Sequence, residues 1–205
     1  EAPGVIIPVC AIAMESPMDT AVLPANPLLD FSGLPRFGAV APAHVQPAVE
    51  RLIADCRAVV GSLGRSEETP TWENFVTPLD DVTERLARAW GVVGHMNAVV
   101  NSPELRDAYN GTLPIVTQFW TELAQDERLF SRYKALRGGT SYARLDDAQK
   151  QSLENELRDF RLGGAELPAD KKARYSAVQE ELSTLMSTFN DNVLDATNAY
   201  TYFVE

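Results

Sequence analysis

Histidine, cysteine and basic residues are scarce in this chain of 205 residues. The two histidines, His44 and His95, are not part of an HExxH sequence, the helical motif with which many metallopeptidases hold zinc and activate water. The two cysteines, Cys10 and Cys56, form no CxxC pair, so the sequence indicates neither a zinc ribbon nor a disulfide framework. Cys56 falls within an apolar helical pattern and is predicted to be a buried thiol.

Basic residues are fewer than acidic ones: the chain has 18 Lys and Arg, 29 Asp and Glu, and a net charge of −11. An acidic surface repels phosphate backbones and anionic lipids, so we expect neither nucleic acid nor a membrane as a partner. The longest apolar run, residues 5–13 (VIIPVCAIA), falls far short of the roughly 20 residues that a membrane span needs. The sparse cysteine predicts a reducing, cytoplasmic location.

Several catalytic and ligand-binding signatures are also missing. The sequence has no GxGxxG, P-loop or EF-hand spacing, and its serines lack GxSxG and SxxK contexts. These absences argue against nucleotide binding, calcium binding and a serine nucleophile.

Helical periodicity fills the chain from Pro42 onward. Apolar residues recur at steps of three and four, and Ser102-Pro103-Glu104 is a compact start signal. The predicted helices are 42–64, 71–100, 102–123 with a kink at Pro114, 129–137, one that opens at Asp146 or Asp147 and ends at 163–164, and one that starts at Pro168. Short Gly- and Pro-containing connections favour antiparallel packing. We therefore predict an all-α fold, an antiparallel, bundle-like helical lobe.

The last predicted helix carries a near-heptad apolar stripe. Its members are Tyr175, Val178, Leu182, Leu185, Phe189 and Val193. Residues 200–204 (YTYFV) then change to β-branched and aromatic types, which predicts an interrupted element and a chain that continues in the native protein.

The amino-terminal region, residues 1–42, is rich in Pro, Ala and Gly without lasting periodicity and is predicted to be an extended arm. Phe31, Leu34 and Phe37 are the expected anchors of this arm on the helices; the alternative is a flexible leader with incidental aromatics. Residues 1–25 are assigned to a leader or an added extension. Met14 is a plausible native start, in which case residues 1–13 would lie upstream of it.

Few residues are candidates for catalysis or for metal binding. As a catalytic base, His95 would need a carboxylate placed near it by the fold, and Glu84, the closest preceding acid, lies about three turns away on a helix. A structural role is the preferred interpretation for His95 and His44. Asp80, Asp81 and Glu84 could be read as a metal site, but a solvated acidic face is the preferred interpretation. We therefore assign no catalytic, cofactor-binding or metal-ligating residue. Trp72, Trp90 and Trp120 lie on apolar stripes and are predicted to pack in the core.

Extended strings of the sequence resemble a known family. They are residues 26–49, residues 71–109 (TWENFVTPLDDVTERLARAWGVVGHMNAVVNSPELRDAY), residues 155–160 (NELRDF) and residues 191–197 (DNVLDAT). Together they resemble the amino-terminal part of the thimet-type zinc oligopeptidases, in the oligopeptidase A branch. The resemblance covers residues 26–205, which we expect to form one helical domain.

The resemblance implies a domain of a zinc metalloendopeptidase that hydrolyses short unstructured peptides in the cytoplasm. Its zinc would be bound by the carboxy-terminal part, outside this chain, and the domain would form part of the channel wall that limits substrate size. The fragment itself is expected to be inactive. Its expected partners are the carboxy-terminal catalytic lobe, oligopeptide substrates and, through a bare apolar interface, further copies of itself.

Two alternatives remain open at this point. One is a stand-alone helical module that binds peptides or a partner protein without catalysis. The other is an unrelated enzyme that uses His95 with acidic neighbours.

Overall fold

The computed structural model describes residues 26–202; the predicted leader, residues 1–25, and the final residues 203–205 lie outside the described part. Six α-helices fill most of this range: α1 (Pro42–Arg65), α2 (Thr77–Val99), α3 (Pro103–Ala124), α4 (Glu127–Gly138), α5 (Asp147–Leu162) and α6 (Ala169–Ala199). Short helical turns lie at Pro27–Leu29, Phe37–Ala39, Trp72–Val76 and Thr140–Arg144. No strand occurs within residues 26–202, and the all-α prediction is confirmed.

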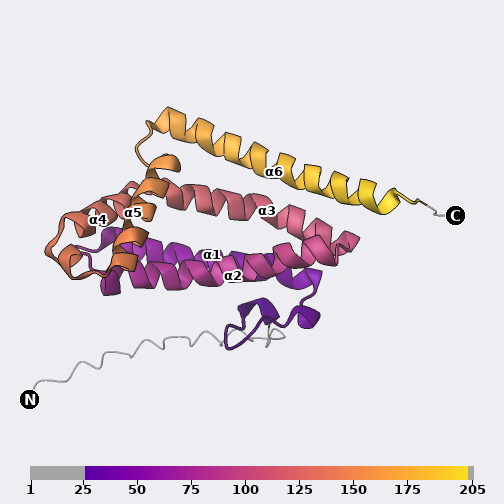
Figure 1. Ribbon diagram of the computed structural model, residues 1–205, viewed down its shortest axis with the longest axis horizontal. Coiled ribbons are helices and arrows are strands. Elements are labelled where there is room, and N and C mark those ends of the chain that lie inside the picture. The colour runs from indigo at the N-terminus through magenta and orange to yellow at the C-terminus, as the bar shows by residue number, and fades with distance from the viewer. Residues whose placement is uncertain (1–25, 203–205) are drawn as a thin grey trace, which may run out of the picture.

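The long helices run back and forth along one axis (Figure 1). α1 packs against both α2 and α3, and α4 and α5 close one end of this three-helix layer. α6 then returns along α3, the helix on which it packs. The predicted antiparallel, bundle-like arrangement is therefore confirmed.

Three helix starts are capped at the residues that the sequence indicates. Thr71, Ser102 and Asp146 each accept a hydrogen bond from the backbone N–H three residues further on, at 3.2, 3.2 and 2.8 Å. Such caps satisfy amide groups that the first turn of a helix leaves unpaired. After Thr71 the chain makes a π-helical turn, Trp72–Val76, and continues directly into α2.

The core consists of two clusters of buried side chains. One lies between α1, α2 and α3, and the other joins the start of α2 to α4 and α5. Cys56 is fully buried in the first cluster, where its thiol donates to the Val82 carbonyl at 3.4 Å. Burial raises the pKa of this thiol to about 11, so Cys56 behaves as a small apolar residue, as predicted. The three tryptophans are partly buried and pack against these clusters.

The amino-terminal arm differs from its prediction. Between residues 26 and 41 it is not extended but folds through two short turns. Leu28 is buried and Phe31 packs against the first cluster, so these two residues anchor it. Leu34 is 91% exposed; its prediction as an anchor is wrong, because it lies in the loop between the two turns. Phe37 is partly exposed and meets the His95 ring edge-on, with 5.5 Å between centroids.

The junction between α5 and α6 depends on a close backbone approach. A Cβ atom at Gly163 would lie 2.5 Å from the Cβ of Ala124 at the end of α3. Gly164, which follows, has φ +95°, a conformation that glycine adopts at low cost. These two glycines let the end of α5 sit against α3 and turn the chain into α6.

Gly163→Ala should therefore lower the free energy of unfolding by about 1–3 kcal/mol, because the added methyl group overpacks this junction. Gly91→Ala is the matched control: nothing lies within 4 Å of a Cβ there, and alanine favours a helix by about 1 kcal/mol. Urea denaturation followed by circular dichroism measures both. A Gly163→Ala protein as stable as the Gly91→Ala protein would contradict the described junction.

Candidate functional site along helix α6

No residue of α6 is buried, although the helix is 31 residues long. The residues of its second half that face α3 and the end of α2 are mostly small or polar. Those that line the groove between the helices are Ser183, Met186, Ser187, Asn190, Asp191 and Leu194. Polar side chains therefore make up most of the attachment of the second half of α6 to the rest of the domain.

An arginine of α3 makes the strongest of these attachments. Arg106 binds the Asp195 carboxylate through both terminal nitrogens at 2.8 Å, and its Nε lies 3.5 Å from Asp191. The hydrogen bond from Arg106 lowers the pKa of Asp195. The Asn110 amide donates to Asp191 at 3.0 Å and accepts from the Ser187 hydroxyl at 2.7 Å. Bidentate, charge-assisted pairs of this kind fix geometry as well as contributing energy.

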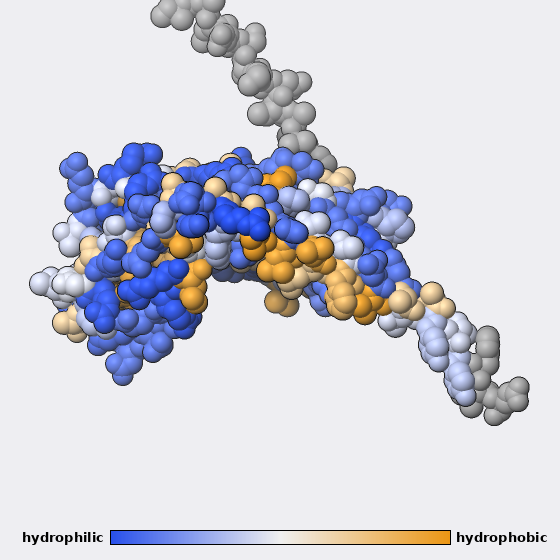
Figure 2. Space-filling model, turned by 90° about the horizontal axis from the view of Figure 1, so that it is seen from above, coloured by the Kyte–Doolittle hydropathy of each residue, from blue (hydrophilic) through white to orange (hydrophobic). Residues whose placement is uncertain are grey.

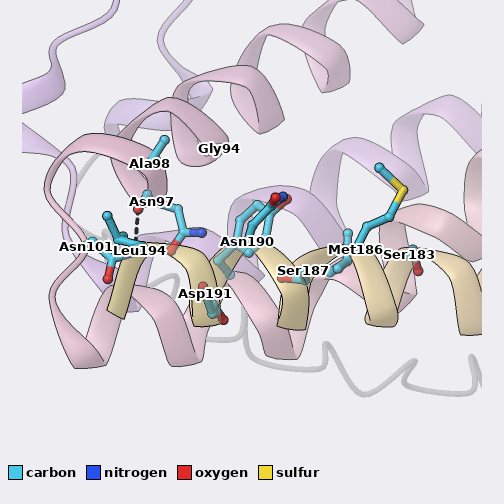
Figure 3. Close-up of a pocket in the computed structure, with 12 residues that line it drawn as sticks. Gly94, Asn97, Ala98, Asn101, Ser183, Met186, Ser187, Asn190, Asp191 and Leu194 are labelled. Atoms are coloured by element: carbon cyan, nitrogen blue, oxygen red, sulfur yellow. Dashed lines mark hydrogen bonds between the residues drawn. The ribbon is translucent and has the colours of Figure 1, made fainter. Parts of the chain in front are cut away.

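A groove of about 430 Å³ lies between α6 and the end of α2. Figure 3 shows Ser183 to Leu194 along α6 on one side and Gly94 to Asn101 on the other. The Asn101 side chain donates to the Asn97 carbonyl at 2.7 Å, the dashed line in the figure. Asn101 has φ 47°, which asparagine tolerates, and it ends α2.

The groove contains an unused hydrogen-bond acceptor. The side-chain oxygen of Asn97 is buried and has no partner within residues 26–202. A buried acceptor without a partner carries a cost that a donor group from a bound molecule would remove. A peptide N–H is a donor of the right kind, and the volume matches pockets that take small ligands.

The apolar residues of α6 form a largely exposed surface, which we call the α6 stripe; Leu182 and Met186 at its edge also line a recess against α3. Its residues are between 39% and 67% exposed, and they are Val178, Leu182, Leu185, Met186, Phe189 and Val193. At 3.6 residues per turn, its centre lies nearly opposite Ser187, Asp191 and Asp195, the polar residues that bond to α3. Figure 2 shows hydrophobic surface gathered along one edge, beside a hollow in the outline.

An exposed stripe of this length is unusual for a folded domain. Scattered apolar residues on a surface need no explanation, whereas a contiguous apolar patch marks an interaction site. The near-heptad spacing predicted from the sequence is thus present, and the described residues leave much of the stripe exposed. This is the bare apolar surface that the interpretation as a fragment of a larger protein predicts.

The two histidines have surroundings typical of structural residues. The Nδ1 atom of His44 accepts the backbone N–H of Ala41 at 3.0 Å, which caps the start of α1. His95 is exposed near the end of α2 and contacts the ring of Phe37. These surroundings give no support to the alternative in which His95 works with acidic neighbours.

The acidic residues of α2 do not converge on one point. Asp80, Asp81 and Glu84 are all exposed, as a solvated face requires, and Asp80 also lines a pocket at the start of the helix. No group of three or more His, Cys, Asp or Glu side chains that could hold a metal ion occurs within residues 26–202. The side chains in this part of the chain therefore do not fit a zinc site.

The Arg106 attachment can be tested directly. Arg106→Ala removes the ion pairs that attach α6 to α3. Because these pairs are partly exposed to solvent, we expect amide exchange in residues 187–199 to become only several-fold faster. Exchange in α1 and α2 should be unchanged. Arg51→Ala, which removes only an exposed pair with Asp55 within α1, is the control. Equal exchange in both variants would show that Arg106 does not hold α6.

The comparisons with known proteins agree with this architecture. Residues 49–172 match the family model of the neurolysin/thimet oligopeptidase N-terminal domain. The chain belongs to this oligopeptidase family. It is similar to Oligopeptidase A of Haemophilus influenzae (43% identical over 88% of this chain) and of Escherichia coli (44% over 87%). It is also similar to the organellar oligopeptidase A of Arabidopsis thaliana, at 32% identity over 91% of this chain.

The chain spans about a quarter of the length of these oligopeptidases, 24–26% in each case. The recognition of an oligopeptidase A amino-terminal portion is thereby confirmed. Within residues 26–202 no helix has the length and apolar character needed to cross a membrane. The Arg106 attachment was not foreseen, although Asp191 and Asp195 both stand in the DNVLDAT string that carries part of the resemblance.

Proposed function

We propose that this chain is the helical amino-terminal domain of a zinc metallo-oligopeptidase that hydrolyses short, unstructured peptides. The α6 stripe is the observation that carries the proposal, because an amino-terminal domain must present a surface to the rest of its protein. Its family membership supports the same conclusion, and so does the fact that it spans only about a quarter of the length of its relatives. The remaining polypeptide, with the catalytic lobe, is the proposed partner of the stripe.

The proposed role of the domain is to form part of the wall of a channel. A wall of rigid, packed helices restricts entry to extended chains, since a folded protein cannot pass between two such lobes. The groove beside α6, with its free Asn97 acceptor, offers a place where the backbone of an extended peptide can be held. The chain itself is proposed to be inactive, with the zinc bound by residues outside it, and the full-length protein is proposed to act in the cytoplasm.

The same groove favours one other function, a stand-alone peptide-binding module without catalysis. The two functions differ in what covers the α6 stripe. A stand-alone module must keep the stripe exposed or pair it with another copy, whereas in the full-length peptidase it is buried. Self-association of the separate domain through the stripe is proposed in either case.

Substrate-size dependence tests the proposal. Quenched-fluorescence peptides of about 8, 16 and 30 residues, and a folded protein carrying the same cleavable sequence, are offered to the full-length protein and to this chain. The expected result is hydrolysis of the shorter peptides by the full-length protein alone, with the folded protein left intact. Equal cleavage of the folded protein would refute the channel-wall role, and hydrolysis by this chain alone would refute its inactivity.

A further inference from the structure

A second pocket, of about 210 Å³, lies where the start of α2 and the end of α3 meet α4 and α5. Leu79, Trp120 and Phe160 contribute apolar walls, and Asp80 and Glu156 contribute carboxyl groups. The pocket is distinct from the groove beside α6, and the proposed function makes no use of it. It is small for a drug-sized ligand, but its size suits a single amino-acid side chain or a small amine.

The two carboxyl groups have no cationic partner within residues 26–202. No Lys or Arg lines the pocket, and neither Asp80 nor Glu156 belongs to an ion pair there. A third acid in the lining, Asp159, differs in that it pairs with Arg158 at 2.8 Å. The fold thus places two acids without a cationic partner beside one recess, with Glu156 half-buried and Asp80 more exposed to solvent. Their proximity and partial burial disfavour the ionised form of Glu156.

The electrostatics agree with this geometry. Burial raises the pKa of Glu156, and the neighbouring charges of Asp80 and Asp159 raise it further. Burial, followed by the charge of Asp81, raises the pKa of Asp80. A bound cation would relieve both effects, because an opposite charge favours the ionised form of a carboxyl group.

The nearly buried side chain of a tyrosine is a third polar group in the lining of the pocket. Tyr133 lines the pocket, is 1% exposed, and forms no side-chain hydrogen bond with a described residue. Buried tyrosine hydroxyls normally have a hydrogen-bond partner. A ligand that carries N–H groups in this recess would give the Tyr133 oxygen a donor to accept from.

We propose that this pocket binds an organic cation, an alkylammonium or alkylguanidinium group such as the end of a Lys or Arg side chain. Asp80 and Glu156 pair with the charge, Tyr133 accepts a hydrogen bond from it, and the aromatic and aliphatic walls cover the alkyl stem. Aromatic faces attract organic cations, whereas a hard metal ion requires six or more oxygen ligands. The inference is independent of the proposed peptidase function.

Titration of this chain with butylammonium, followed by the NMR signal of the Trp120 indole N–H, tests the proposal. The expected dissociation constant is on the order of 1 mM for a ligand of this size. Glu156→Gln and Asp80→Asn should each weaken binding at least tenfold. Glu84→Gln is the matched control, because it removes the same charge one turn from Asp80 on α2 without lining the pocket; its effect should stay within twofold.

Binding tests with other ligands distinguish a polypeptide side chain from a free amine and test whether charge is needed for binding. An acetylated lysine-containing tripeptide amide that binds as well as butylammonium would identify a polypeptide side chain, and cadaverine binding alone would identify a free amine. Saturable binding of butan-1-ol with equal strength would overturn the proposal, since charge would then play no part. So would Ca²⁺ displacing butylammonium at equal concentration, or no binding of any amine.

The charge repulsion also predicts a ligand-free effect on stability. A carboxyl group whose pKa is raised by folding favours the folded state below its ordinary pKa, near 4.5 for Glu156, and loses that contribution as pH rises through the raised value. Glu156→Gln does not titrate, so at pH 7 its urea midpoint should exceed that of the unsubstituted protein. The difference should shrink as pH falls toward 4. A difference that is independent of pH would show that Glu156 is not under electrostatic stress.

Discussion

Replacing Leu86 by alanine is expected to lower the free energy of unfolding by about 2–5 kcal/mol. Leu86 lies in the middle of α2, is fully buried, and belongs to the cluster shared by α1, α2 and α3. Truncation removes apolar contacts and leaves a cavity among helices that cannot close it completely. Urea denaturation of this chain, followed by circular dichroism, measures the change.

Leu185→Ala is the matched control for this substitution. The chemical change is identical, but Leu185 is 59% exposed on the α6 stripe, so the expected change is within about 0.5 kcal/mol. The difference between the stability losses of Leu86→Ala and Leu185→Ala therefore tests whether the hydrophobic core lies between α1, α2 and α3, with the apolar residues of α6 outside it. Similar losses at both positions would mean that α6 is packed in solution in a way that the described structure does not show.

The double substitution Leu185→Asp and Phe189→Asp should have opposite consequences in two settings. In this chain the free energy of unfolding should change by no more than about 1 kcal/mol, because the two side chains are 59% and 67% exposed. Self-association should decrease, because the substitutions place charges on the exposed apolar surface. In the full-length protein it should destabilise by at least 3–5 kcal/mol, since the proposed interface would bury unpaired charges. Peptidase activity should fall at least tenfold there.

Thr188→Asp separates a general effect of added charge from loss of the interface. Thr188 is exposed beside Phe189 but lies on another side of the helix from the stripe. In the full-length protein it should preserve activity within about twofold. Light scattering of the separate domain and activity of the full-length protein are the two measurements. A double variant that retains full activity would show that the α6 stripe is not the surface that meets the catalytic lobe.

Local signals in the sequence predicted the helices well. The caps at Thr71, Ser102 and Asp146 depend on residues at most three positions apart, so the chain's own chemistry sets these starts whatever the tertiary fold. Apolar periodicity likewise identified the buried faces of α1 and α2, because a helix that packs on neighbours must present a continuous apolar face.

Longer-range features could not be predicted from the sequence. Periodicity indicated the apolar stripe on α6 but did not reveal that the second half of α6 bonds to α3 through polar residues. Arg106 and Asp195 are 89 residues apart, and only the turn of the chain at Gly163 and Gly164 brings their helices together. The pocket with Asp80 and Glu156 was missed for the same reason. Leu34 was misassigned because the sequence pattern does not show on which side a loop places its apolar residue.

Quantifying zinc and peptidase activity in the protein expressed from its native gene, beside this chain of 205 residues, tests the central claim most directly. The account predicts a polypeptide several times longer than this chain, with one zinc ion and chelator-sensitive hydrolysis of oligopeptides, while this chain shows neither. A native protein that ends near Glu205 without metal or activity would contradict the peptidase assignment and leave a helical binding module in its place.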